Sequence, residues 1–211
     1  MRYFPDKHSG RNISVSLDEM IEKLGLHQND IQLDSVNDNA SNMKLTIRLG
    51  GYLSEYYCDI HTIELGLKDA IKKSPAVLKI LEKTKKIAKK VNKSSPALSD
   101  LKNACESENI PFKKPVNPPN TRWAGYYLNL KSILYLKKPL IHLFSESEHF
   151  SEFYLSQADW KLLEKSVELL KHYKDTILIW ESETSPTMHR VIERVYTLEK
   201  KLSEFIYRNS S

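Results

Sequence analysis

The sequence predicts a short segment of mixed α/β structure followed by a longer, entirely helical region, so the chain as a whole should be predominantly helical. Strand-like patterns occur only before His61. Beyond that point apolar residues recur at helical spacing. The change coincides with Ser74-Pro75, and proline favours a boundary because it cannot continue a helix from the preceding residue. We therefore expect two parts, residues 1–73 and residues 74–211.

The first part is expected to alternate helices with two short strands. The helix, strand, helix, strand and helix are expected, in order, near 16–24, 31–36, 40–49, 56–58 and 61–71. In the first helix, Leu17, Met20, Ile21 and Leu24 fall on one face, and Gly25 fits the stop at its C-terminus.

The second part is expected to be a set of amphipathic helices. The first has an apolar stripe, Val77, Ile80, Leu81, Thr84, Ile87, Ala88 and Val91, with Lys79, Lys83, Lys86 and Lys90 on the other face. Ser95-Pro96 should start a helix, 110–120 should be a proline-rich loop, and Pro139 should break or kink the helix that resumes near Trp123. A long stripe follows, made of Trp160, Leu163, Val167, Leu170, Ile177 and Trp180; Pro186 should open a last helix, with Val191, Val195, Leu198, Leu202 and Phe205 inward.

Composition and charge limit the classes of function. The chain has 211 residues, of which 40% are hydrophobic and 28% charged, a balance typical of folded domains. No apolar run is long enough for a membrane span, and two cysteines are too few for a disulfide framework. Residues 68–93 hold ten lysines against Asp69 and Glu82. Such a segment indicates either a polyanionic partner or a solvated helix face.

Three groups of residues could carry chemistry. Asp38 follows the first strand, where a carboxylate can bind a divalent metal, although capping of the next helix is the commoner role. Cys58 and His61 are spaced i, i+3; two ligands do not make a zinc site, and a buried thiol beside a helix-start histidine is the alternative. Arg122 and Trp123 could contact phosphate and an unpaired base, unless Trp123 lies in the core, as Trp160 and Trp180 are expected to.

The order of these groups resembles the hAT family of DNA transposases. The resemblance is carried by HSGRNI (8–13), DNASNM (38–43), CDIHTIEL (58–65) and Thr121-Arg122-Trp123. It implies an RNase H-like sheet with a helical insertion, in which two aspartates and a glutamate hold two Mg²⁺ or Mn²⁺ ions. Asp38 matches the second aspartate, with Asn37 where the family has threonine, and Cys58 and His61 match residues that support the active site. Arg122 and Trp123 match an insertion-domain motif whose tryptophan stabilises a flipped base.

The resemblance also implies what this chain lacks. Asp38 is the one catalytic acid of the three that we find, so we expect no stably bound Mg²⁺ or Mn²⁺ and no catalysis by this chain alone. The expected protein is a truncated or domesticated hAT transposase-derived protein, made of a partial RNase H-like core and a helical insertion. Family members form homo-oligomers, but the dimerisation segment is not expected here.

DNA is the expected partner, contacted through Lys83, Lys86, Lys90, Arg122 and Trp123, in the nucleus and away from membranes. A nuclear protein-interaction module without DNA binding or catalysis is the alternative. A nuclease completed by acids from another chain is a third reading.

Overall fold

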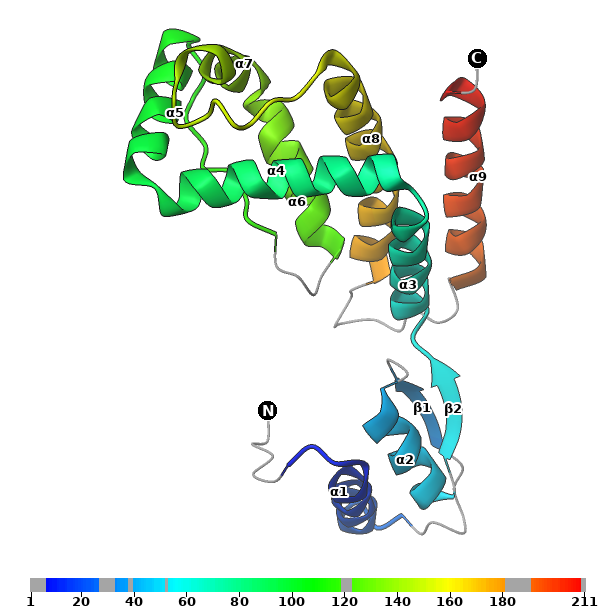
Figure 1. The fold of residues 1–211 in the computed structure, drawn as a ribbon. Coiled ribbons are helices and arrows are strands. Elements are labelled where there is room, and N and C mark those ends of the chain that lie inside the picture. Colours follow the sequence, from blue (N-terminus) through cyan, green and yellow to red (C-terminus); the bar gives the residue numbers. More distant parts are fainter. Residues whose placement is uncertain are drawn as a thin grey trace. The chain divides into compact units, whose positions relative to one another are not determined.

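The computed structural model describes residues 7–26, 33–37, 40–51, 53–118, 123–180 and 191–209. Contacts within the chain divide it into two compact units, Met1–Gly66 and Leu67–Ser211. In the described residues helices predominate, and the strands form one two-stranded sheet (Figure 1). The predominantly helical fold is therefore confirmed. The domain boundary at residue 73 and the RNase H-like character of the first part stay predictions.

The first unit contains a β-α-β arrangement. Its elements are α1 (Gly10–Lys23), β1 (Leu33–Asn37), α2 (Ser41–Gly50) and β2 (Leu53–Tyr57), and α3 (Asp59–Lys72) follows. β1 and β2 pair in parallel, from Leu33 opposite Leu53 to Asn37 opposite Tyr57. Because parallel strands end at the same edge, this register brings the carboxyl ends of both strands together.

The first helix differs from the expectation. It begins at Gly10 rather than Ser16, and Ser9 is its N-cap, accepting a hydrogen bond from the Asn12 amide at 3.3 Å. Met20 and Leu24 are 50% and 71% exposed, so the expected apolar face is wrong at these positions. The reason is that α1 packs on α2 with a face that includes Gly10. Gly25 has φ +70°, as a C-terminal stop requires.

Gly10 allows α1 and α2 to approach each other closely. A Cβ at Gly10 would lie 2.4 Å from the carbonyl oxygen of Asn42 and 2.7 Å from the Cβ of Leu45. The Thr46 hydroxyl donates to the Gly10 carbonyl at 2.9 Å, and the Asn42 side-chain amide donates to the His8 carbonyl at 3.1 Å. The segments HSGRNI and DNASNM are thus held together by the close approach at Gly10 and by the hydrogen bond from the Asn42 side chain to the His8 carbonyl.

The regular elements of the second unit are all helices in its described residues. It contains α4 (Pro75–Lys93), α5 (Ser95–Ser107), α6 (Trp123–Tyr135), α7 (Lys137–Glu146), α8 (Gln157–Trp180) and α9 (Val191–Asn209). Helix α4 contacts α5, α6 and α8, while α5 contacts α7, and α8 contacts both α6 and α9. Its core side chains Ile80, Ile87, Leu130, Ile133 and Leu163 are 0–1% exposed. None of the described helices combines the length and the apolar character that crossing a bilayer requires.

Most helix expectations for this unit are confirmed. The α4 stripe from Ile80 to Val91 is buried, and a break at Leu136 separates α6 from α7, which carries Pro139 in its first turn. In α9, Leu198 and Phe205 are buried, but Val195 is 43% exposed, so the inward face is narrower than expected. The start expected at Pro186 lies outside the described residues.

The proline-rich loop has no regular secondary structure over 110–118 and is fixed by side chains of two helices. Asn92 of α4 donates to the Pro115 carbonyl at 2.9 Å. In α6, Asn129 donates to the Val116 carbonyl at 2.7 Å, and the Ser132 hydroxyl accepts from the Val116 amide at 3.0 Å. These bonds hold the chain that leads to α6.

The close approach at Gly10 gives a direct test of the first unit. We expect Gly10→Ala to destabilise this unit by about 1–3 kcal/mol, because a backbone atom has to move to admit the methyl group. Gly66→Ala is the matched control, since no atom lies within 4 Å of an added Cβ there and alanine favours a helix. Hydrogen exchange of α1 and α2 peptides measures the effect; equal protection in both variants would contradict this role of Gly10.

Candidate nucleic-acid interface

Asp38 lies outside the described residues, but the residues around it are placed. Asn37 ends β1, and its carbonyl accepts a hydrogen bond from the Cys58 amide at 2.7 Å. Cys58 follows β2 directly, so the strand pairing brings the segments before Asp38 and around Cys58 to one edge of the sheet. The N-cap position of α2 belongs to Ala40, which makes no side-chain cap. The N-cap residue of α2 is therefore Ala40 and not Asp38.

Cys58 and His61 stand at the start of α3. Both are half-buried, and the Cys58 thiol is free. The Cys58 carbonyl accepts hydrogen bonds from the amide and the hydroxyl of Thr62, at 3.0 and 3.1 Å. No group of three His, Cys, Asp or Glu that could hold a metal occurs among the described residues.

The Thr-Arg-Trp motif is placed only in part. Thr121 and Arg122 lie outside the described residues, and Trp123 is the first residue of α6, of whose side chain nothing is described. Trp160, in contrast, is 4% exposed in the core of the second unit, as expected. The side chain of Trp180 is also outside the described residues.

The lysine face of α4 divides into paired and unpaired positions. Lys83 forms an ion pair with Asp159 at 2.6 Å, and Lys90 lies 3.9 Å from Glu152. No ion pair with another described residue is found for Lys86, Lys89 or Lys93, which are exposed. Of the three lysines expected to bind DNA, Lys86 is thus the one whose ammonium group meets no carboxylate of the described chain.

Asp159 joins α4 to the N-terminus of α8. Its carboxylate accepts from the amide and hydroxyl of Ser156 at 2.9 and 3.0 Å, and the Ser156 hydroxyl accepts from the Asp159 amide at 3.1 Å. This reciprocal pair is a capping box. Burial acts to raise the pKa of Asp159, but hydrogen bonds from Lys83 and Ser156 outweigh it and hold the pKa below 3.8. The Lys83 ammonium group is therefore held in an ion pair that joins α4 to α8.

The remaining lysines surround a shallow depression of about 420 Å³. Lys86, Lys89, Lys90 and Lys93 line it, together with Ser94, Glu152 and Phe153. Four lysines and one acidic residue thus line the same depression, and Lys90 is the lysine that lies near the Glu152 carboxylate. This concentration of positive charge favours a phosphate-bearing ligand.

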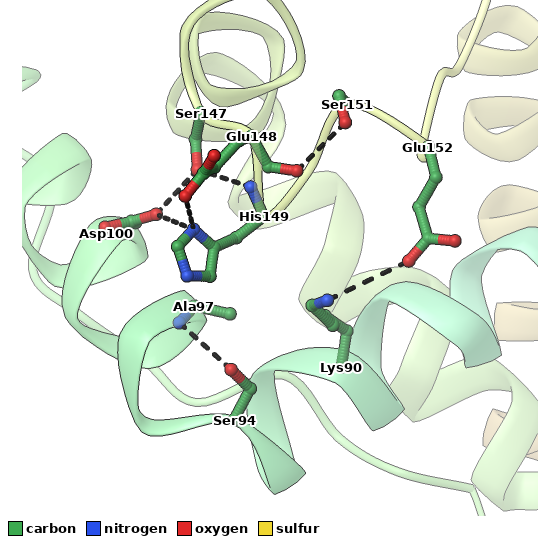
Figure 2. A network of polar contacts seen from close by, with 9 residues as sticks. All are labelled: Lys90, Ser94, Ala97, Asp100, Ser147, Glu148, His149, Ser151 and Glu152. Atoms are coloured by element: carbon green, nitrogen blue, oxygen red, sulfur yellow. Dashed lines mark hydrogen bonds and ion pairs between the residues drawn. The ribbon is translucent and has the colours of Figure 1, made fainter.

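The far wall of the depression comes from the segment 147–153, which is tied to α5 (Figure 2). The Ser147 hydroxyl donates to Asp100 of α5 at 2.6 Å, and His149 Nδ1 lies 3.5 Å from the same carboxylate oxygen. Phe150 is fully buried. Figure 2 shows Glu152 at the end of this segment, with its carboxylate toward Lys90 of α4.

Asp159, Glu152 and Phe153 were not predicted from the sequence as site residues. One local signal for Asp159 was present, because Ser156-Gln157-Ala158-Asp159 has the spacing of a capping box before an apolar helix. No local pattern relates Glu152 or Phe153 to α4, since they reach it only through the packing of the second unit.

Comparison with known proteins gives one family. The model described as "ZBED1 RNase-like helical domain" matches residues 57–169, which run from the end of β2 into α8. The match therefore includes the lysine face and the depression. No curated protein and no solved structure matches the chain.

The Lys83–Asp159 pair predicts how stability depends on pH. Asp159→Asn should lower the free energy of unfolding of the second unit by about 1–3 kcal/mol near neutral pH. Because the folded pKa of Asp159 is lowered, its contribution is present above 3.8 and is lost as the pH falls through the folded value. The difference between wild type and variant should therefore shrink below pH 3.8.

Urea unfolding followed by circular dichroism, at neutral pH and in steps down through pH 3.8, measures this difference. Asp69→Asn is the control, because it removes only the exposed pair with Lys73 and should barely shift the unfolding midpoint. A difference that stays constant at low pH would contradict the assigned role of Asp159.

Proposed function

Because the chain belongs to the family described as the ZBED1 RNase-like helical domain, we propose that it is an hAT transposase-derived protein whose helical unit binds DNA in the nucleus. The hAT assignment rests on the order of DNASNM, CDIHTIEL and Thr121-Arg122-Trp123. Binding is to the phosphate backbone, and it does not require Asp38 or a metal ion.

The observation that supports DNA binding best is the set of unpaired lysines around the depression. Lys86, Lys89 and Lys93 lie within eight positions of one helix, and the seven steps between the first and the last span about 10 Å at 1.5 Å per residue. A solvated helix face requires charge but no concavity, whereas these lysines line a hollow together. Neutralising phosphates releases counterions, and that release supplies most of the affinity of sequence-independent binding.

The lysines expected from the sequence contribute unequally under this proposal. Lys83 is held by Asp159 at 2.6 Å and contributes little to binding. Lys90 is shared with Glu152, whose carboxylate is 3.9 Å away and 68% exposed. An exposed pair at this distance is weak, so phosphate competes with Glu152 for Lys90.

The salt dependence of binding tests this assignment. In the triple variant Lys86→Gln, Lys89→Gln and Lys93→Gln, affinity for a DNA duplex should fall on the order of tenfold to a hundredfold at low salt. The slope of log K against log salt should become shallower by up to about 3, because each lost phosphate contact removes close to one released ion. Fluorescence anisotropy at a series of salt concentrations gives both quantities.

A second triple variant serves as the control. Lys165→Gln, Lys171→Gln and Lys200→Gln remove the same charge from exposed positions of α8 and α9 that do not line the depression. These changes should leave most of the affinity and slope intact. Equal losses in both triple variants would mean that net charge, and not this surface, drives binding. A flat salt response of the wild-type chain would refute DNA binding itself.

A protein-interaction module is the second candidate function, and a separate hollow favours it. This hollow has about 610 Å³ and an apolar lining that includes Phe144 and Leu155. Ile141 and Tyr154, 48% and 69% exposed, also line it. Solvent-exposed apolar side chains around a concave surface are typical of a site for an apolar segment of a partner.

The two functions predict opposite effects for a change in this second hollow. Ile141→Glu should leave DNA affinity within about twofold of wild type if the DNA proposal holds, because position 141 does not line the lysine depression. A chain without salt-dependent DNA binding, whose capture of a nuclear partner is lost in Ile141→Glu and kept in the Lys86, Lys89 and Lys93 variant, would establish the interaction module instead.

A further inference from the structure

Phe153 places an aromatic ring on the wall of the lysine depression. It lines the hollow with Lys86, Lys89, Lys90 and Lys93 and is only half-buried. The core position nearby in the chain is filled by Phe150, which is fully buried. Phe153 is therefore less buried than Phe150, and it lines the same depression as the four lysines.

The ring is held in place by its own segment. Its centroid lies 6.3 Å from that of Phe150 in an edge-to-face arrangement, with an interplanar angle of 63°. The Phe153 amide donates to the Phe150 carbonyl at 2.8 Å, which closes the turn between them. Upstream, Ser147 is anchored to Asp100 of α5 at 2.6 Å (Figure 2). A ring fixed before the ligand arrives loses little conformational entropy on binding.

The combination selects among nucleic-acid forms. Phosphate charge is the same in a duplex and in a single strand, so the lysines alone do not distinguish them. A ring within a hollow meets the face of a base only when that base is not stacked between neighbours in a duplex. Basic grooves that carry aromatic rings bind single strands in this way, because every base offers a π face.

We propose that the depression binds an unpaired segment of DNA, with one base stacked on Phe153 and the adjoining phosphates neutralised by Lys86, Lys89 and Lys93. This inference rests on the proposed function, since it assigns the same lysines to phosphate, and it adds the class of ligand that the site prefers. Glu152 sets the affinity for all polyanions through its competition for Lys90 and does not contribute to the preference.

Two single variants separate the ring from the charge. Anisotropy is measured with a labelled thymidine oligonucleotide of about 15 residues, within the range of single-strand sites, and with a duplex of equal length. Phe153→Ala should weaken binding of the single strand about tenfold, which is the loss of one stacked base, and leave the duplex within about twofold. Glu152→Gln should tighten binding of both to a similar extent, because it removes a like-signed charge from both complexes.

Phe153→Tyr keeps the ring and should keep the single-strand preference, while far-UV circular dichroism checks that Phe153→Ala remains folded. An unchanged single-strand affinity in Phe153→Ala, or equal losses for single strand and duplex, would overturn the inference. If the duplex still binds with a steep salt dependence in that case, the DNA proposal stands without it. If neither ligand shows salt-dependent binding to the wild-type chain, the proposed function and this inference fail together.

Discussion

The second unit depends on the carboxylate of Asp159, because this group both caps the start of α8 and forms an ion pair with Lys83 of α4. Helix α8 has unsatisfied amides at its start, and the capping box with Ser156 satisfies part of that need. The same oxygen takes the Lys83 ammonium at 2.6 Å, although the Asp159 side chain is only 18% exposed. Because the Asp159 carboxylate is poorly solvated, removing its partner Lys83 would leave a buried unpaired charge and destabilise the fold. The start of α8 is thereby fixed against the middle of α4.

Fixing α8 in this way also fixes what lies before it. The segment 147–153 is bounded on one side by α7 and on the other by the capped start of α8. It is further anchored by Ser147 on Asp100 and by Phe150 in the core. Glu152 and Phe153 consequently lie beside α4, where they line one depression together with its lysines. The proposed preference for phosphate and for unpaired bases follows from this geometry.

A different constraint organises the first unit. There the backbone of α1 comes so close to α2 that Gly10 has no space for a side chain. The side chains of Asn42 and Thr46 donate hydrogen bonds to the carbonyls of His8 and Gly10. HSGRNI and DNASNM are therefore linked by packing and by these hydrogen bonds. The parallel pairing of β1 with β2 then brings Asn37 to Cys58.

The helical character of the chain, the α4 stripe and the break before Pro139 could be predicted from the sequence alone, because periodicity and proline are local signals. The start of α1 could not be predicted in this way, because the contact of Gly10 with α2 decides which face of α1 is buried. The sequence likewise did not distinguish Lys83, Lys86 and Lys90 as DNA-binding residues. Only the tertiary structure separated them, because the acids that pair with Lys83 and Lys90 come from residues 152–159, far along the chain.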